Sequence, residues 1–534
     1  MYIEKIIGPP GTGKTAALIG RVEMELGNGV DPERLGYYSF TRAAARVAQQ
    51  RVQAAFPDYS RESFPHFRTL HSEAFRQLGL TKDMVMVGKN LQEFSSAFGY
   101  EISQAHIEDE DIEEYEVREA VLKTLGDYLI FFTNWRANLL LDFELAYRAF
   151  WDLHRESLPY GWSPGVVHLF EERYREYKEE RVLLDFNDML TRVLEEGLHP
   201  NLDVLVFDEA QDSGPLQYKV LDFWLQGVKR HYIAGDPDQC LYQWMGTDPD
   251  ILMARPCDHL THLVQSYRIP RAVHRLATGI IHTTADYRPR PVDGEVSDLS
   301  LEGVLNRFVS LNGNTAFILV RNLYLLGYLI GELFQWGIPF ENLRGPAPFR
   351  GKTAAKILIA RKLFRGESMP AEDLWLLVKD IPQKPYFLRG FKAEAQTLAK
   401  EQPQLPVGLR GIREYCLGSF LDDPIGALGL SPRNQAYFKR VIQRYGEDVL
   451  LERPRLSIGT IHSAKGMEAD YVAVCPDMSK KTWVGWQRLP EEEKRVWYVA
   501  ATRAREGLLL IHPESEYCWT WPKVKPQLNI DMEV

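Results

Sequence analysis

The stretch from Gly8 to Thr15 (GPPGTGKT) has the residue types and spacing that bind phosphate, G-x-x-x-x-G-K-[ST]. Between a strand and a helix, a glycine-rich turn exposes backbone N–H groups to phosphate, while its lysine reaches the β- and γ-phosphates and its hydroxyl holds Mg²⁺. A chance glycine turn is the simpler alternative, but a short apolar run precedes the motif and a helical pattern follows it, as the chemistry requires. We therefore predict a nucleoside triphosphate site made of Gly8, Pro9, Pro10, Gly11, Thr12, Gly13, Lys14 and Thr15.

An acid pair, Asp208 and Glu209, is the second chemical signal, because it follows four apolar residues that suit a strand buried on both faces. A carboxylate at that strand end can hold Mg²⁺, and the adjacent glutamate can orient and deprotonate an attacking water. A strand that merely ends in acidic turn residues would not account for the phosphate loop in the same chain. The pair predicts hydrolysis.

A third strand, 231–234, ends in Gly235-Asp236-Pro237-Asp238-Gln239, and Tyr242 and Trp244 follow. An amide near the γ-phosphate beside exposed aromatic side chains is a plausible way to couple nucleotide state to base stacking. Aromatic residues also fill cores, so this spacing alone leaves both interpretations open.

The elements that must position these residues follow a β-α-β order. A helix to about Leu26 leads into a second buried strand, 35–40, and the segment 67–72 repeats the form with a hydroxyl and an imidazole before a helix. Residues 90–182 are helical in pattern and predict an all-α insertion. Within it, 108–116 carries seven acids in nine residues, either a solvated surface or a partner site.

Composition limits the class of protein. At 534 residues, with 45% hydrophobic and 25% charged residues, the chain is expected to form several globular domains. The net charge of −10 means that nucleic acid would bind a local groove and not a general basic field. Five scattered cysteines, without ligand spacing, favour a reducing compartment without zinc or iron–sulfur sites. Without a signal segment or an apolar run of eighteen residues, we expect a cytoplasmic protein.

Three later segments carry a family resemblance: 263–268 (LVQSYR), 457–470 (SIGTIHSAKGMEAD) and 492–505 (EEKRVWYVAATRAR). With the preceding motifs, in order from about residue 3 to 510, they resemble the UvrD/Rep-like branch of superfamily 1 DNA helicases. The resemblance implies an α/β fold of two RecA-like motor domains, each a doubly wound parallel sheet with a mainly α-helical insertion. The expected segments are 1–89 and 183–275 for the first motor domain, 90–182 for its insertion, 276–344 and 450–534 for the second, and 345–449 for its insertion.

The resemblance also implies residue roles. Arg268 and Arg503 would contact the γ-phosphate as arginine fingers, Gln239 would sense it, Tyr267 would stack on adenine, and Glu468, with Gly466 nearby, would bind ribose. With Lys14 and Glu209, these residues would form the catalytic and ATP-binding set, and Thr15 and Asp208 the Mg²⁺ site. Single-stranded DNA would contact Phe40, Thr41, Arg42, His71, Tyr242, Trp244, Arg321, Asn322, Thr460, His462 and Ser463, because aromatic faces accept any base and polar groups follow phosphates.

Some features depart from the family pattern. Only seven residues precede Gly8, and they lack the upstream glutamine element that reads adenine, so strict preference for ATP is not implied. Met245 and Ala43 replace a basic residue and a lysine, with Arg42 as compensation for the latter. A second glycine-rich segment, 345–353, has the wrong glycine spacing and two prolines, and we reject it as an ATP site. The second insertion is short, so translocation is implied more directly than strand separation.

The sequence thus predicts an ATP-dependent DNA helicase or translocase that uses ATP and Mg²⁺ on single-stranded DNA and its junctions with duplex. The resemblance, and not the residues, implies 3′-to-5′ movement in replication, repair or recombination by a monomer, without a membrane partner. A translocase that strips proteins without efficient unwinding, an ATP-gated binding module and an RNA helicase remain alternatives. The pathway, any loading partner and the role of the C-terminal tail stay open.

Overall fold

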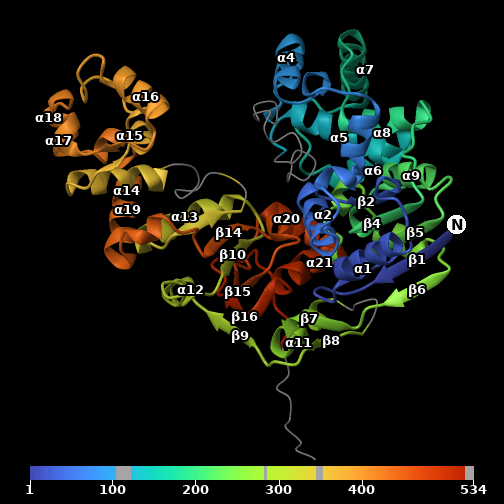
Figure 1. Cartoon of the computed structure of the whole chain (residues 1–534). Helices are drawn as coiled ribbons and strands as arrows, with labels where there is room; N and C mark the ends of the chain where they lie inside the picture. The colour runs from blue at the N-terminus through green and yellow to red at the C-terminus, as the bar shows by residue number, and fades with distance from the viewer. Residues whose placement is uncertain (104–121, 282–285, 344, 346–352, 524–534) are drawn as a thin grey trace, which may run out of the picture. The chain divides into compact units, whose positions relative to one another are not determined.

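The computed structural model describes residues 1–103, 122–281, 286–343, 345 and 353–523 (Figure 1). The acidic run at 108–116 and most of the segment 345–353 lie outside these residues. Two compact units make up the described chain. The first holds the described residues of Met1–Asp293, Val484–Thr502 and Pro522–Val534, and the second holds those of Gly294–Trp483 and Arg503–Trp521.

The first unit is built on a six-stranded parallel sheet, as the β-α-β pattern predicts. Its strand order is β3-β2-β4-β5-β1-β6, and every neighbouring pair is parallel. The strands are β1 (Tyr2–Ile7), β2 (Leu35–Ser39), β3 (Phe67–Arg68), β4 (Val204–Asp208), β5 (Arg230–Gly235) and β6 (His259–His262). The second strand ends at Ser39, so Phe40 begins the following loop and is not the last strand residue.

Helices cover both faces of this sheet, which explains why its strands are nearly continuous apolar runs. Alternate residues of β4 enter opposite cores: Val204 and Val206 pack on one face, Leu205 and Phe207 on the other. One face is covered by α1 (Lys14–Gly27) and α2 (Arg42–Ala55); the other is covered by α3 (Leu70–Gln77), α8 (Phe186–Glu195), α9 (Pro215–Trp224) and α10 (Pro249–Ala254).

The expected helical insertion has its own aromatic core, centred on Phe94, Phe132, Phe150 and Phe170. Its described helices stand together in the first unit (Figure 1), and α5 contacts α8 and α9 of the sheet layer. The insertion therefore has its own core and packs, through α5, on helices that cover one face of the sheet. These helices are α4 (Gly88–Phe98), α5 (Leu125–Leu139), α6 (Phe143–His154) and α7 (Pro164–Arg181).

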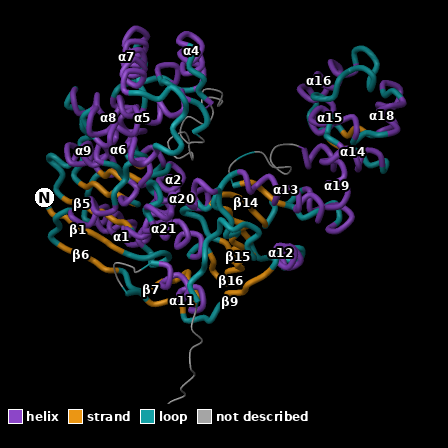
Figure 2. The backbone as a smooth tube through the Cα atoms, turned by 180° about the vertical axis from the view of Figure 1, so that it is seen from behind, coloured by secondary structure: helices purple, strands orange, loops and turns teal. Residues whose placement is uncertain are grey.

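The second unit contains another six-stranded parallel sheet, seen as neighbouring orange segments in Figure 2. Its order is β11-β14-β10-β15-β16-β9. The strands are β9 (Glu295–Leu299), β10 (Ala316–Val320), β11 (Phe340–Asn342), β14 (Leu456–Thr460), β15 (Ala469–Val474) and β16 (Ala504–Ile511). Its apolar core includes residues of α12 (Leu301–Phe308), α13 (Tyr324–Trp336), α14 (Thr353–Phe364) and α19 (Pro432–Tyr445).

A smaller, separate core lies within the second insertion, around Leu374, Leu377, Phe387 and Phe420. This part is mainly helical, as expected, and it also contains one short antiparallel pair, β12 (Met369–Pro370) with β13 (Pro406–Val407). The helices packed there are α15 (Ala371–Val378), α16 (Phe391–Glu401), α17 (Leu409–Ile412) and α18 (Gly418–Asp422).

The division into units differs from the sequence-based boundaries at two places. Residues 276–293 and the helix α21 (Pro490–Ala501) were expected in the second motor domain, but they belong to the first unit. There, α21 contacts α11 (Arg271–Ile280) and the short 3₁₀ turn Pro237–Gln239. A helical pattern does not specify which sheet its apolar face covers, so the sequence could not place this helix. Among the described residues, no helix combines the length and the apolar content needed to cross a membrane.

Candidate functional site

The phosphate loop follows β1 and ends at the start of α1, and of its residues Gly8 to Gly13 only Gly11 and Gly13 are partly exposed. Gly11 and Gly13 have positive φ, +72° and +87°, a conformation that glycine adopts without strain. Gly13 is the N-cap residue that precedes α1, and it has no side chain to cap the helix, so the first N–H groups of α1 are turned to the loop. The Lys14 ammonium, 8% exposed, donates to the Gly8 carbonyl oxygen at 2.7 Å and thus folds back over the loop.

Parallel pairing brings the other strand ends to the same edge as this loop. Ile7 pairs with Gly235, and Ser39 pairs with Asp208. Phe40, Glu209 and Asp236, each one residue further along, therefore leave the sheet at the same carboxyl edge as Gly8, and Asp236 follows the strand next to β1. This is the edge where open α/β sheets bind ligands.

Thr15 and Asp208, the two residues expected at a Mg²⁺ site, are in direct contact. The Thr15 hydroxyl donates to Asp208 Oδ2 at 2.8 Å, and the Tyr37 hydroxyl donates to the same oxygen at 2.8 Å. Burial, followed by the charge of Glu209, raises the pKa of Asp208 to about 6. A hydroxyl and a carboxylate at this distance are a donor set that suits Mg²⁺. Sequence reasoning missed Tyr37, which lies inside β2 and gave no chemical signal.

Glu209 has a strained backbone, with φ of +54° in a residue other than glycine. Such a conformation costs of the order of 1–2 kcal/mol and is concentrated at functional sites. The Gln211 amide donates to Glu209 Oε2 at 2.6 Å, and the Asp236 N–H donates to Gln211 Oε1 at 2.9 Å. Gln211 therefore fixes the glutamate and ties the ends of β4 and β5 together.

Gln239 lies in the 3₁₀ turn that follows β5, and its amide donates to Asp236 Oδ2 at 2.5 Å. Burial raises the pKa of Asp236, an effect that the Lys14 ammonium opposes. Lys14, Asp236 and Gln239 thus form one buried polar group at the edge of the phosphate loop.

The segment 266–268 packs directly on the phosphate loop. Ser266 donates its hydroxyl hydrogen to the Pro10 carbonyl at 2.9 Å, and the Tyr267 N–H donates to the Gly11 carbonyl at 2.8 Å. A Cβ built on Gly11 would stand 2.4 Å from Arg268 Cβ. The Tyr267 ring is 72% exposed, as a side chain that stacks on a ligand base would be. This segment belongs to β7 (Gln265–Pro270), which pairs with β8 (Arg288–Arg290).

A cavity of about 140 Å³ brings together four of the expected DNA-binding residues, Phe40, His71, Tyr242 and Trp244. Phe40 and Tyr242 stack with ring centroids 5.2 Å apart. The expectation of an exposed Tyr242 was wrong: the residue is 2% exposed, because Phe40 and the cavity wall cover it. Thr41 and Arg42 lie outside the lining; the Thr41 hydroxyl accepts from Ala44 N–H and caps α2.

The insertion and the helix α8 of the sheet layer line the other side of this cavity, which sequence reasoning missed. Phe131 of α5 packs on Trp244 at 5.7 Å between centroids, and Phe186 of α8 meets His71 edge to face at 5.8 Å. Asn134, Asn138 and Asn187 add amide groups to the lining. Phe131 was visible only as part of an apolar helical stripe, and only contact with Trp244 separates it from ordinary core residues.

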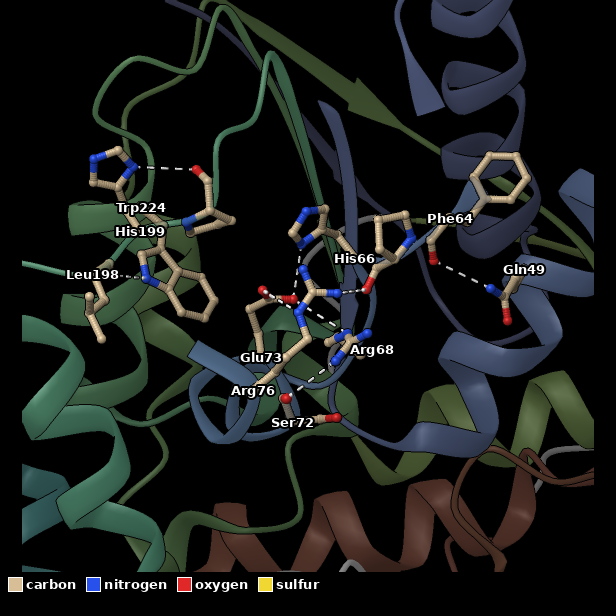
Figure 3. A network of polar contacts seen from close by, with 12 residues as sticks. Gln49, Phe64, His66, Arg68, Ser72, Glu73, Arg76, Leu198, His199 and Trp224 are labelled. Carbon is tan, nitrogen blue, oxygen red and sulfur yellow. Dashed lines mark hydrogen bonds and ion pairs between the residues drawn. The ribbon is translucent and has the colours of Figure 1, made fainter. Parts of the chain in front are cut away.

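A buried charge network holds the segment that presents His71 (Figure 3). Glu73, 1% exposed, is 3.0 Å from His66 Nδ1 and 3.4 Å from Arg68 Nε. Thr69 caps α3 by accepting from the Ser72 N–H. The cap and the ion pairs hold β3 and the first turn of α3 together, and His71 lies in that turn.

The expected residues of the second unit gather at the carboxyl edge of its own sheet. Val320 pairs with Thr460, so the segments Arg321–Asn322 and Thr460–Ser463 leave neighbouring strands together. The Asn322 amide donates to Thr482 Oγ1 at 3.0 Å, and Asn322 Oδ1 accepts from Ser479 N–H at 2.9 Å. Thr460, His462 and Ser463 are buried, and the Ser463 hydroxyl donates to the Thr460 carbonyl at 2.7 Å.

Arg503 lies beside the segment that contains Gly466 and Glu468. Its guanidinium donates to the Met467 carbonyl at 3.2 Å, and its own carbonyl accepts from Ala469 N–H at 3.1 Å. Glu468 is exposed and is 3.4 Å from Arg505. The second unit therefore places the buried Arg503 beside the segment that contains the exposed Glu468, and the roles that the resemblance assigns to these two residues stay predictions.

Two six-stranded parallel sheets, the first with a phosphate-binding type of loop after β1 and an acid pair after β4, define the class of RecA-like α/β proteins. Residues 4–259 match the family model of the UvrD/REP helicase N-terminal domain, and residues 439–515 match that of the UvrD-like helicase C-terminal domain. Together these segments make up more than half of the chain. The chain belongs to the UvrD/Rep-like helicase family.

Curated relatives are similar at low identity. The chain is 21% identical to the ATP-dependent DNA helicase PcrA of Staphylococcus aureus, over 53% of this chain and 38% of that protein. It is 24% identical to a probable DNA helicase II homolog of Mycoplasma capricolum, over 47% of this chain and 34% of the relative. A longer match, 23% identical over 95% of this chain and 76% of the relative, is to the ATP-dependent DNA helicase UvrD2 of Mycobacterium bovis. The chain thus spans little more than a third of the first two relatives.

Proposed function

We propose that this protein hydrolyses ATP to move along single-stranded DNA and to separate duplexes. One observation carries the proposal: the segment from Asp236 to Thr247 has its first residues beside Lys14 and its last residues in the aromatic cavity. A movement of Asp236 or Gln239 on nucleotide binding would therefore be passed through only a few residues to the side chains that bind the bases. The names of the relatives, which are DNA helicases, support the same function.

In the first unit, the phosphate loop binds the triphosphate through its N–H groups and Lys14. Thr15 and Asp208 hold Mg²⁺, which when bound neutralises charge on the phosphates. Glu209, fixed by Gln211, accepts a proton from the attacking water. Arg268, placed against Gly11, meets charge on the γ-phosphoryl group, and Tyr267 stacks on the base. Gln239 responds to the loss of the γ-phosphate.

In the second unit, Arg503 supplies a second arginine finger, and Glu468, beside Gly466, binds ribose. Arginine fingers are worth roughly 10³- to 10⁵-fold in rate where they have been measured. Thr460, His462, Ser463, Arg321 and Asn322 continue the strand path through contacts with phosphates. These assignments rest on the family motifs and on the grouping of the residues at one sheet edge.

The DNA strand binds the first unit through the cavity, where bases stack on the partly exposed Phe40 and Trp244, and the buried Tyr242 and His71 support these contacts from the cavity wall. Thr41 and Arg42, at the start of α2, contact phosphates. Stacking does not depend on base identity, so binding is expected with little sequence preference. We further propose movement in the 3′-to-5′ direction by a monomer, in replication, repair or recombination.

The test is the rate of ATP hydrolysis with no polynucleotide, with single-stranded DNA, with duplex DNA and with single-stranded RNA. Stimulation by single-stranded DNA alone supports the proposal, whereas slow hydrolysis that no polynucleotide changes would favour an ATP-gated binding module. Unwinding of duplexes with a 3′ or a 5′ tail then measures direction. Translocation without unwinding on either tail would identify a translocase that displaces proteins.

A further inference from the structure

The turn Gln243–Met245, which carries Trp244, is held by two side chains that lie far from it in sequence. We propose that Asn138 of the helical insertion and Arg495 of α21 are positioning residues, which together fix this turn so that Trp244 faces the aromatic cavity. The proposal rests on the proposed function, because it assigns a role in strand binding to Asn138, outside the family motifs, and to Arg495, which lies in the segment 492–505 but has no role among those that the resemblance implies. Neither residue is expected to contact the nucleotide.

Asn138 is the last polar residue of α5, and its amide donates to the Met245 carbonyl at 2.9 Å. The same amide occupies the space beside Gly214, where a Cβ would stand 2.4 Å from Asn138 Nδ2. Gly214 precedes α9 and follows the acid segment 208–212. Asn138 therefore contacts both Gly214, which follows the acid segment, and the turn that carries Trp244.

A second glycine, Gly246, lies where the turn approaches the last residue of α5, Leu139. Gly246 has φ of +90°, and a Cβ there would stand 2.9 Å from Leu139. The end of α5 and the turn thus approach so closely that two glycines, Gly214 and Gly246, accommodate the contact. Phe131, two turns earlier on α5, packs on the Trp244 ring itself. The insertion consequently fixes the backbone and one face of the indole.

Arg495, which follows the turn in sequence whereas Asn138 precedes it, also bonds to this region. Its Nε donates to the Pro237 carbonyl at 3.2 Å, and its Nη1 donates to Gln243 Oε1 at 2.8 Å. Pro237 begins the 3₁₀ turn that carries Gln239, and Gln243 begins the turn that carries Trp244. One rigid guanidinium therefore bridges the two turns, and it transmits a shift at Gln239 to Trp244.

The backbone hydrogen bonds within the turn are local. Within it, Met245 N–H donates to the Tyr242 carbonyl and Gly246 N–H to the Gln243 carbonyl, each at 2.8 Å. These bonds close the turn but do not attach it to the sheet layer. In the described part of the chain, the side-chain hydrogen bonds that attach Gln243–Met245 to other segments come from Asn138 and Arg495, beside the ring contact of Trp244 with Phe131. The orientation of Trp244 therefore depends on the helices α5 and α21.

The experiment is a set of double-mutant cycles read by equilibrium binding of a fluorescent single-stranded oligonucleotide to the full chain. Asn138→Asp keeps the shape and removes the donor, and Arg495→Ala removes both donors. Each should weaken binding about tenfold, since a net hydrogen bond is worth about that factor. In a Trp244→Ala background, neither change should weaken binding further, because the residue they position is gone.

Three further variants separate positioning from general damage. Gly214→Ala should displace Asn138 and weaken binding as Asn138→Asp does. Arg495→Lys retains a donor and should restore part of the affinity lost in Arg495→Ala. Lys494→Ala removes a neighbouring surface cation that bonds only Glu491 in the described structure, and it should bind as the wild type does. Thermal melting checks that each variant is folded.

Effects that add fully to that of Trp244→Ala, or wild-type affinity in both Asn138→Asp and Arg495→Ala, would overturn the inference. A failure of the proposed function looks different, because the wild-type protein would then not bind single-stranded DNA at all. If Trp244→Ala weakens binding and the two positioning variants do not, strand binding stands and only the positioning role is refuted.

Discussion

Replacing Gly11 by alanine should damage nucleotide binding while the fold is kept. Gly11 has φ of +72°, and its added Cβ would stand 2.4 Å from Arg268 Cβ and 2.9 Å from Ser266 Oγ. The first of these atoms is fixed to the backbone of β7 and is not the end of a flexible side chain. Either the loop or the segment 266–268 must therefore move.

The magnitude follows from two terms. A residue other than glycine in the left-handed region costs about 1–2 kcal/mol. Separating the segment from the loop also weakens the hydrogen bond from Tyr267 N–H to the Gly11 carbonyl, worth about 1 kcal/mol. The sum of about 2–3 kcal/mol corresponds to a loss of roughly 30- to 150-fold in nucleotide affinity, if the bound loop must take its native form.

Two glycines of the same region give matched controls. Gly13 also has positive φ, +87°, but its Cβ would meet only Ala16 Cβ, at 3.9 Å, so Gly13→Ala incurs the strain without the clash. Gly20 lies in α1, and its Cβ would meet nothing within 4 Å. Gly20→Ala should leave affinity unchanged and stabilise the helix by about 0.5–1 kcal/mol.

The assay is equilibrium titration of a fluorescent ATP analogue with Mg²⁺, with thermal melting of each variant. We expect the loss of affinity to fall in the order Gly11→Ala, Gly13→Ala, Gly20→Ala. A folded Gly11→Ala variant that binds nucleotide as tightly as the wild type would refute the argument, because the contact between Gly11 and Arg268 would then have no role in the bound loop.

Three further outcomes are expected. Glu209→Gln should retain nucleotide binding and lower the rate of hydrolysis by roughly 10²- to 10⁴-fold; near-normal turnover would exclude Glu209 as the base. Glu73→Ala leaves the partly buried Arg68 without its carboxylate and should lower the free energy of unfolding by about 3 kcal/mol, whereas an unchanged denaturant midpoint would show that the network in Figure 3 contributes little. Burial lowers the pKa of His231 to about 4. Because the unfolded imidazole gains its proton near pH 6.5 and the folded one does not, stability should fall by about 3 kcal/mol between pH 6.5 and 4. His231→Leu should flatten that part of the pH profile, and an equally steep profile in this variant would contradict the assignment.

The features that could be predicted from the sequence are those that depend on residues close together along the chain. The phosphate loop, the strand before Asp208 and the turn after β5 are local patterns, in which a few apolar residues and the polar group that follows them specify a strand end. Parallel pairing then brings these ends together without further information, because carboxyl ends of parallel strands share an edge. The cluster of Thr15, Asp208 and Gln239 was predictable for this reason.

Contacts between distant segments were not predictable from one sequence. Asn138 and Met245 are 107 residues apart, and Arg495 and Gln243 are 252 apart. An asparagine near the end of a helix has the same local pattern whether it faces solvent or a glycine of another segment. The burial of Tyr242 and the packing of α21 in the first unit depend in the same way on which surfaces meet, and not on the residues beside them.

Met245 shows why a departure from the family pattern need not disrupt the turn. The resemblance leads one to expect a basic side chain at this position, yet the contact that fixes the turn is made by the backbone carbonyl, which accepts from Asn138. Every residue type offers that carbonyl. The loss of a cation therefore removes one attraction for the phosphates of the strand, and it leaves intact the anchor that directs Trp244 to the cavity. If the first unit binds single-stranded DNA as proposed, its affinity should therefore depend more on base stacking and less on charge. Strand affinity should then fall with a shallower salt dependence than a basic residue at 245 would give, and Met245→Lys should steepen it by about one counterion without altering the effect of Asn138→Asp.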